Sequence, residues 1–258
     1  LFVAVFHWGI AGAAYATIFA QYVSGIGILL YVLFRCRNLL PEKKDLCFDG
    51  GILKEIAGLS SLTCLQQSVM NFGILMVQGL VNSFGATTMA AFAAAVKIDT
   101  FAYLPVQDFG NAYSTFIAQN YGAGNKERIR RGTKESFAIS TAFSLVISAL
   151  VFAFAAPLMQ IFVSSAETAV IASGVRYLRI EGAFYFGIGC LFLLYGYYRA
   201  IKRAEMSVVL TVISLGIRVL LAYVLSATFL GETGIWMAIP IGWILADLTG
   251  LLYMRKTW

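Results

Sequence analysis

The sequence predicts an all-α polytopic membrane protein, and three observations support this fold class. Apolar residues make up 60% of the chain and charged residues only 12%, whereas soluble domains carry about 25% charged residues. Several apolar runs exceed the length of about 18 residues with which a helix can cross hydrocarbon. The Lys and Arg residues cluster at every second connection between these runs. Together these features exclude an ordinary water-soluble domain.

The apolar runs divide the chain into a series of expected membrane spans. Residues 1–8 resemble the end of one span, and the chain starts with neither an initiator Met nor a signal-peptide pattern, so we expect Leu1 to lie inside a longer gene product. A basic linker at residues 35–51 follows the first complete span. Complete spans are predicted at residues 10–34, 52–84, 88–120, 133–155, 172–198, 207–229 and 235–254.

The positions of the basic residues predict the orientation of these spans. Fifteen of the 19 Lys and Arg residues lie in or beside the linker (Lys54 flanks it), at residues 126–134, at residues 199–203 or at the C-terminus, whereas the connections near residues 83–90, 157–171 and 229–236 carry none. The positive-inside rule therefore predicts cytoplasmic basic loops and a cytoplasmic C-terminus. The net charge of +6 follows membrane topology, so it does not indicate a nucleic-acid partner.

An internal repeat predicts a transporter made of two parallel bundles. Six residues between Gly9 and Tyr31 recur between Gly231 and Tyr253 at a constant offset of 222 positions. The second copy follows the first by six spans, an even number, so both copies cross the membrane in the same direction. Chance similarity between two apolar spans is the alternative explanation.

On this interpretation, each part of the chain has a place in a 6+6 architecture. Residues 1–34 would be the end of the first bundle, containing the tail of its fifth helix and its sixth helix. Residues 35–51 would be a cytoplasmic linker, and residues 52–258 would form the second six-helix transmembrane bundle. The remainder of the first bundle would precede Leu1 and would be the partner of this chain within the same protein.

The span at residues 52–84 carries a stripe of polar side chains on one helical face. The spacings along the stripe are 7, 4, 7 and 4 residues, and its members are Ser60, Gln67, Asn71, Gln78 and Asn82. Polar groups inside a membrane face bundle interiors or aqueous cavities. The stripe therefore predicts a cavity wall, with hydrogen bonding between helices as the alternative.

The next span carries polar residues on two faces. Asp99, Tyr103 and Gln107 share one face, and Lys97, Asp108 and Asn111 share another. Residues at equal distance from the Gly85 turn should lie at similar depth. Asn71 is thereby expected beside Asp99, and Gln67 beside Tyr103.

A carboxylate beside carboxamides and a phenol is a candidate site for a cation. We therefore expect Na⁺ or H⁺ near Asp99 and Asn71, and a substrate and cation site built from Asp99, Lys97, Gln67, Asn71, Gln78, Tyr103, Gln107, Asp108 and Asn111. Elsewhere, Arg176 and Arg179 are expected to snorkel toward the interface, and Arg218 is expected to brace the bundle.

The sequence offers no constellation for an enzyme or a resident metal. It contains no nucleophile and base motif and no phosphate-binding glycine loop, and its single His and four Cys fit no zinc or disulfide spacing. We therefore expect neither catalysis nor an organic cofactor. The expected partners are small organic substrates and the lipid bilayer.

Several motifs resemble the multidrug and toxin extrusion family over almost the whole chain. They are Trp8–Ala14, the run from Phe84 through Phe92 and Pro105 to Ala118–Gly124, Tyr177–Ile180, and Gly234–Pro240. This resemblance implies a twelve-helix fold of two six-helix bundles in a cell membrane. It also implies export of amphipathic, often cationic, compounds by Na⁺ or H⁺ antiport with alternating access. A related flippase for lipid-linked oligosaccharides is the alternative function.

One departure from the family leaves the coupling site open. Some members carry a Glu in the span equivalent to residues 52–84, and it helps to bind the coupling cation. The matching position lies near Met70, and this span holds no acid beyond Glu55. Asp99 on the neighbouring helix could substitute for it, or acids of the first bundle could serve instead.

Overall fold

A computed structural model describes residues 2, 5–37, 40 and 47–257, and these residues form helices and connections without strands. Chain contacts divide the protein into a first unit, Leu1–Lys54, and a second unit, Glu55–Trp258. The first unit contains α1, Gly9–Arg35. Part of the predicted linker, including Lys43 and Lys44, lies outside the described residues.

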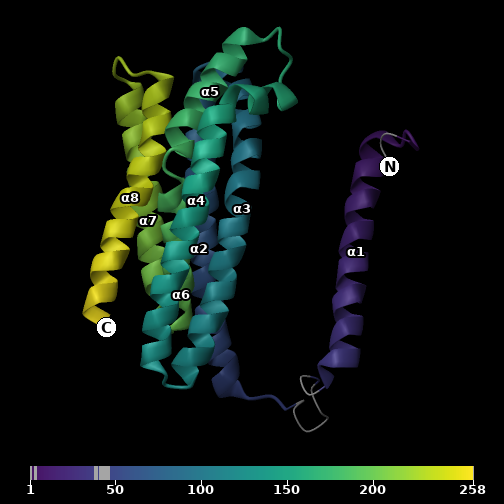
Figure 1. The fold of residues 1–258 in the computed structure, drawn as a ribbon, viewed down its shortest axis with the longest axis vertical. Helices are drawn as coiled ribbons and strands as arrows, with labels where there is room; N and C mark the ends of the chain where they lie inside the picture. Colours follow the sequence, from purple (N-terminus) through teal and green to yellow (C-terminus); the bar gives the residue numbers. More distant parts are fainter. Residues whose placement is uncertain (1, 3–4, 38–39, 41–46, 258) are drawn as a thin grey trace. The chain divides into compact units, whose positions relative to one another are not determined.

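The second unit is a helical bundle (Figure 1). Its helices are α2 (Gly50–Ser83, which begins in the first unit), α3 (Ala86–Gly122), α4 (Lys126–Phe162), α5 (Thr168–Gly182), α6 (Tyr185–Ala200), α7 (Ala204–Ser226) and α8 (Glu232–Thr257). Six described helices, α1 included, are long and apolar enough to span a membrane, and α5 with α6 supplies a seventh if counted together. The predicted all-α fold class is therefore confirmed, and the seven predicted spans compare with six candidate spans, or seven with the bent pair.

Two segments differ from the prediction. The span expected at residues 172–198 is broken, because α5 and α6 meet at a 52° bend. The basic segment at residues 126–134 is not a loop but the first turns of α4, which begins behind Asn125. The Asn125 side chain caps this helix by accepting a hydrogen bond from the Arg128 backbone N–H at 3.1 Å, so the helix starts before the apolar run does.

Tight turns set the two ends of the bundle. Gly85 joins α2 to α3 with a φ of 98°, and Gly124 joins α3 to α4 with a φ of 69°, a backbone region that glycine adopts most readily. We refer to these ends as the Gly85 end and the Gly124 end. The turns at Gly85 and Gly124 fall where the sequence predicted breaks between spans.

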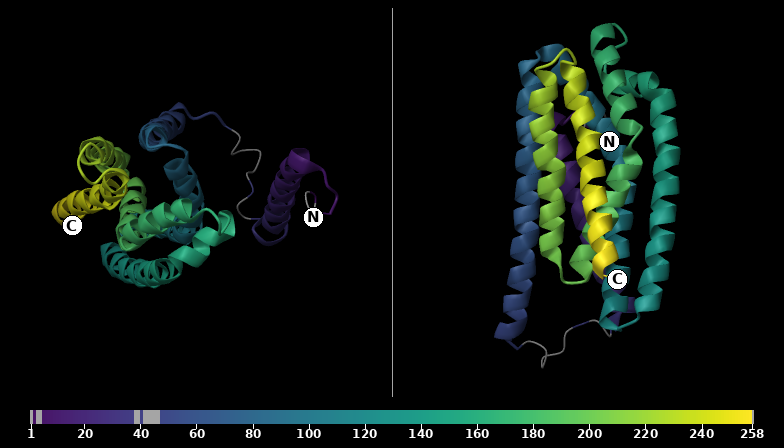
Figure 2. Two further views of the ribbon diagram at one scale, coloured as in Figure 1. Left: turned by 90° about the horizontal axis from the view of Figure 1, so that it is seen from above. Right: turned by 90° about the vertical axis from the view of Figure 1, so that its left-hand side faces the viewer.

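The core of the second unit lies where α3, α5, α6 and α8 meet. Phe92 stacks on Trp236 with ring centroids 5.6 Å apart, and Tyr177 meets Trp236 edge to face at 4.9 Å. Small residues bring α3 and α6 close together, since the Ser114 hydroxyl donates to the Gly196 carbonyl at 2.9 Å. Beside this core, α7 and α8 run along one another (Figure 2).

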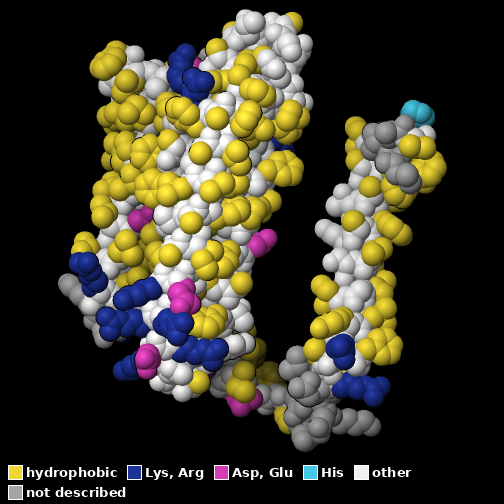
Figure 3. All heavy atoms as spheres, viewed as in Figure 1, with side chains coloured by type: hydrophobic (Ala, Val, Ile, Leu, Met, Phe, Trp, Pro, Cys, Tyr) yellow, Lys and Arg dark blue, Asp and Glu magenta, His cyan; other side chains and the backbone are white. Residues whose placement is uncertain are grey.

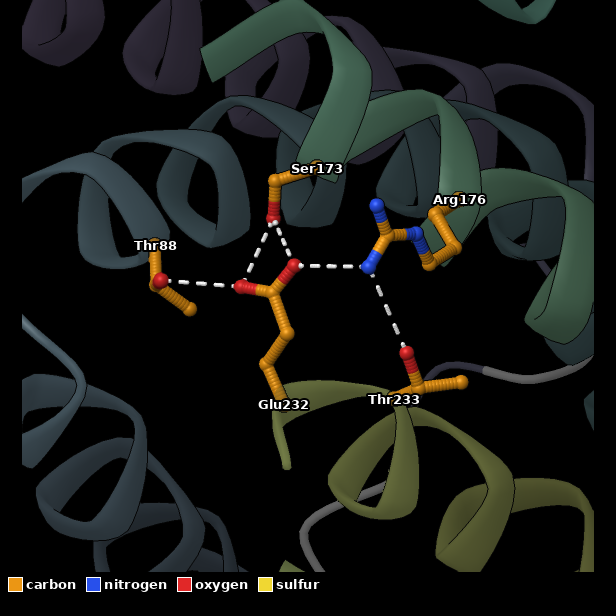
Figure 4. Close-up of polar contacts among 5 residues, drawn as sticks. All are labelled: Thr88, Ser173, Arg176, Glu232 and Thr233. Atoms are coloured by element: carbon orange, nitrogen blue, oxygen red, sulfur yellow. Dashed lines mark hydrogen bonds and ion pairs between the residues drawn. The ribbon is translucent and has the colours of Figure 1, made fainter. Parts of the chain in front are cut away.

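Glu232 ties three helices together at the Gly85 end (Figure 4). Its carboxylate accepts hydrogen bonds from Thr88 of α3 at 2.9 Å and from Ser173 of α5 at 3.1 Å. Arg176 of α5 forms an ion pair with the same carboxylate at 3.3 Å and reaches Thr233 at 3.5 Å. Arg176 therefore has a protein partner, which the expectation of interfacial snorkelling missed.

We expect Glu232→Ala to destabilise the bundle more than Arg176→Ala does. The Ala variant leaves the buried hydroxyls of Thr88 and Ser173 without their acceptor, at a cost of about 1–3 kcal/mol. The Arg176 side chain is 52% exposed, so loss of its ion pair costs only about 0–1 kcal/mol. Thermal unfolding of the detergent-purified protein measures both effects.

Glu205→Ala is the matched control, because Glu205 is also an acid in the first turn of a helix but is exposed. Equal unfolding temperatures for Glu232→Ala and Glu205→Ala would show that Glu232 does not hold the three helices together.

Candidate functional site

A cluster of buried polar side chains lies in the interior of the second unit. Asp99 of α3 is 2% exposed, Tyr177 of α5 is 2% exposed and Glu181 of α5 is 6% exposed. The hydroxyl of Tyr185 at the start of α6 donates a hydrogen bond to Asp99 Oδ1. Glu181 and Tyr177 lie close enough to interact with the same carboxyl, as does Arg218 of α7.

The break between α5 and α6 positions two members of this cluster. Glu181 lies in the last turn of α5, and Tyr185 is the first residue of α6. Around the break, the Phe184 backbone N–H donates to the Glu181 carbonyl at 2.9 Å. Irregular backbone is tolerated inside a membrane where protein surrounds it. The bend therefore directs side chains from two helix ends toward one carboxyl on α3.

Several polar atoms of this cluster have no hydrogen-bond partner among the described residues. Asp99 Oδ2, Glu181 Oε2 and Arg218 Nε are buried and unpaired. Two carboxyl groups placed together repel each other when both are charged, and a cation or a proton relieves that repulsion. Carboxylate and phenol oxygens are also the hard ligands that Na⁺ prefers over nitrogen or sulfur. The cluster is chemically suited to binding H⁺ or Na⁺.

Asp99 and Tyr103 of α3 lie toward α6, and Gln107 follows Tyr103 by about one helical turn. Asp99 is buried, whereas Tyr103 and Gln107 are half-buried. The Tyr103 ring lies 6.2 Å from that of Phe192 on α6. The predicted shared face of these three residues on α3 is therefore present.

The structure does not bring Asp99 together with the amides of α2. Among the described residues, Asp99 forms no hydrogen bond with Asn71 or Gln67, and both amide side chains are exposed. Instead α2 packs through its opposite side, where Leu215 of α7 lies 3.2 Å from the position that a Cβ on Gly73 would occupy. Equal distance from the turn predicts similar depth but not the direction in which a side chain points.

Two polar faces remain exposed on the second unit. On α2 these are Ser60, Gln67, Asn71 and Asn82, with Gln78 half-buried. On α3 they are Lys97, Asp108 and Asn111. These helices are otherwise apolar enough to span a membrane. Such faces are expected to border water or another part of the protein rather than lipid.

Tyr177, Glu181 and Tyr185 were not among the residues predicted for the site. One signal was available, because Tyr177 and Glu181 are four residues apart and so share a helical face. Tyr185 could not be found in this way, since its position depends on the bend after Gly182. Arg218, expected to brace the bundle, lies beside the acids of this cluster.

Comparisons with a family profile and with curated proteins match this chain to one group of membrane transporters. The profile of the family described as MatE matches residues 62–224, which include Asp99, Glu181 and Arg218. The chain is 31% identical to "Probable multidrug resistance protein YpnP" of Bacillus subtilis, covering 99% of this chain and 56% of that protein. It is 26% identical to "Probable multidrug resistance protein NorM" of Thermotoga maritima, covering 95% and 53%.

A solved structure shares the fold. It is described as the outward-facing conformation of a multidrug resistance MATE family transporter, with a TM-score of 0.90 and 24% identity. The match covers 99% of this chain and 58% of that one. This chain therefore spans a little over half the length of the proteins that it matches.

We expect Tyr185→Phe to destabilise the second unit by about 1–3 kcal/mol, because it removes the donor to Asp99 and leaves a buried carboxyl without that hydrogen bond. Tyr223→Phe is the control, since Tyr223 is 47% exposed and forms no side-chain hydrogen bond among the described residues. Thermal unfolding of the purified variants compares them. If Tyr185→Phe unfolded at the same temperature as Tyr223→Phe, the hydrogen bond would contribute nothing to stability.

Proposed function

Because this chain belongs to the MatE family, we propose that the complete protein exports amphipathic, often cationic, organic compounds by antiport against Na⁺ or H⁺. The observation that carries the coupling proposal is the buried pair of carboxyl groups, Asp99 and Glu181. Two relatives named as probable multidrug resistance proteins support the assignment of drugs and toxins as cargo.

The carboxyl pair explains how a cation could drive a conformational change. Without a bound cation, two negative charges beside Arg218 leave a net negative charge in the bundle interior, which is costly at low dielectric. Binding of H⁺ or Na⁺ removes this charge and favours closer packing of α3 against α5 and α6. A ligand shifts such an equilibrium only by its difference in affinity for the two states, and a buried site of this kind supplies one.

The exposed polar faces of α2 and α3 support a cavity between two bundles. Residues 52–258 would form the second bundle, while α1 would be the sixth helix of the first and residues 35–51 the linker between them. Asn71, Gln67, Gln78, Asp108 and Asn111 would then line an aqueous path for cargo. Alternating access would come from movement of one bundle against the other.

The distribution of charge supports the proposed orientation. Lys and Arg side chains of the second unit are concentrated at its Gly124 end (Figure 3). By the positive-inside rule this end would face the cytoplasm. The Gly85 end and the Glu232 contacts would then lie on the outside.

We expect Asp99→Asn and Glu181→Gln each to lower the rate of ethidium export by at least about tenfold, equivalent to a barrier about 1.4 kcal/mol higher. The assay uses everted vesicles containing the complete protein, with the Na⁺ and pH gradients imposed separately. The gradient that drives export in the parent identifies the coupling ion. Glu205→Gln, at an exposed position outside the cluster, should export normally.

Unchanged ion dependence in Asp99→Asn would show that coupling does not use this carboxyl. If ethidium never moved under either gradient but a lipid-linked oligosaccharide crossed the membrane, the flippase function would replace export.

A further inference from the structure

A groove lined by one basic side chain lies beside the Gly85 half of α3. Its volume is about 640 Å³, and it lies between α3 and the segment that joins α4 to α5. Ala90, Ala93 and Ala94 form much of the α3 wall, and Phe162 and Val163 lie on the other side. Small-molecule sites typically occupy about 300–1,000 Å³, so the groove can hold a drug-sized compound.

The basic residue that lines this groove is Lys97 of α3. Its side chain is exposed, and within the described part of the chain it forms neither an ion pair nor a hydrogen bond. Asp99 is only two residues away but is buried on a different side of the helix, against α6. The acid that does line the groove is Glu167, which precedes α5 in the loop at the Gly85 end.

The depth of Lys97 makes an unpartnered ammonium costly. It lies 11 residues beyond Ala86, the first residue of α3, which is about 16 Å along the helix at about 1.5 Å per residue. That is about half of the roughly 30 Å hydrocarbon thickness. A Lys at mid-membrane costs about 2.5–3.5 kcal/mol unless water or an anion compensates it.

We propose that this groove binds the anionic group of a transported compound, with Lys97 as its counter-ion. This proposal rests on the proposed export function and extends its cargo to amphipathic organic anions and zwitterions. The alanine wall leaves room for a carboxylate or phosphate to approach the ammonium. Phe162 and Val163 offer apolar surface to the body of the compound, and Glu167 can meet a positive group in a zwitterion.

The arrangement favours one anionic group rather than a polyanion. One Lys supplies one full charge, and the rest of the groove is lined mainly by small and apolar residues. A polyanion would leave uncompensated charge against these walls, at a high desolvation cost. Arg176 belongs to the Glu232 contacts and does not line this groove.

The test compares an organic anion with an organic cation in the complete protein. Export of fluorescein and of ethidium is measured in everted vesicles, and binding of both dyes to the purified protein is measured by fluorescence anisotropy, at a mildly acidic pH at which fluorescein carries a single negative charge. We expect Lys97→Met to weaken the binding and export of fluorescein at least about tenfold. Binding and export of ethidium should stay within about twofold of the parent. Lys97→Arg, which keeps the charge, should retain fluorescein within about threefold of the parent.

Lys134→Met is the matched control, because it removes one exposed Lys from α4 at the Gly124 end. This variant should change neither the binding nor the export of either dye. Equal loss of both dyes in Lys97→Met would overturn the proposal, since Lys97 would then serve the transport cycle as a whole. Failure of fluorescein to bind the parent would overturn it as well.

The two proposals can fail separately. If the protein exports ethidium but does not bind fluorescein, the proposed anion site is wrong and the proposed export function stands. If the protein binds fluorescein through Lys97 but exports neither dye, the proposed anion site is supported and the proposed export function is wrong.

Discussion

Hydrocarbon neither donates nor accepts hydrogen bonds, and this constraint determines where each polar group of the chain can lie. The backbone meets this constraint by forming helices, in which most carbonyl and N–H groups within a span are paired. Polar side chains meet this constraint in two ways. Asp99 and Glu181 are buried among partners inside the second unit, whereas Lys97, Asp108 and Asn71 are exposed on helices that are otherwise apolar. The buried group supplies the candidate cation site, and the exposed group marks the surface that we propose borders water.

The bend between α5 and α6 shows how the chain satisfies this constraint at an irregular point. A break inside a span exposes backbone groups that a continuous helix would pair. Here the Phe184 and Gly187 N–H groups turn back to nearby carbonyls, at 2.9 and 2.8 Å. Because protein surrounds the break, its cost is limited, and it brings Glu181 and Tyr185 to the same carboxyl on α3. The local irregularity and the polar cluster are therefore one feature of the fold.

Hydropathy and glycine positions were sufficient to predict the spans and the turns at Gly85 and Gly124, because both depend on local sequence. The direction in which a helix faces depends on its neighbours. The amide stripe lies along one side of α2, yet the side that packs on α7 is the one containing Gly73. Glu232 lies 56 residues from its partner Arg176, so no local pattern indicated their ion pair. Tyr185 reaches Asp99 only because α5 ends at Gly182, and the sequence alone read this segment as one span.

The positions of Asp99 and Lys97 give α3 a particular place in the proposed transport cycle. Successive residues on a helix are about 100° apart, so these two side chains project about 200° apart around α3. One faces the buried cluster with α5 and α6, and the other faces the groove. Any shift of α3 that follows neutralisation of the carboxyl pair must therefore also move the Lys97 ammonium relative to the opposite wall. Linkage makes this coupling reciprocal, because cargo that prefers one position of α3 changes the affinity of the cluster for its cation by the same factor. A single rigid helix would thus connect ion and cargo without a chain of intermediate contacts.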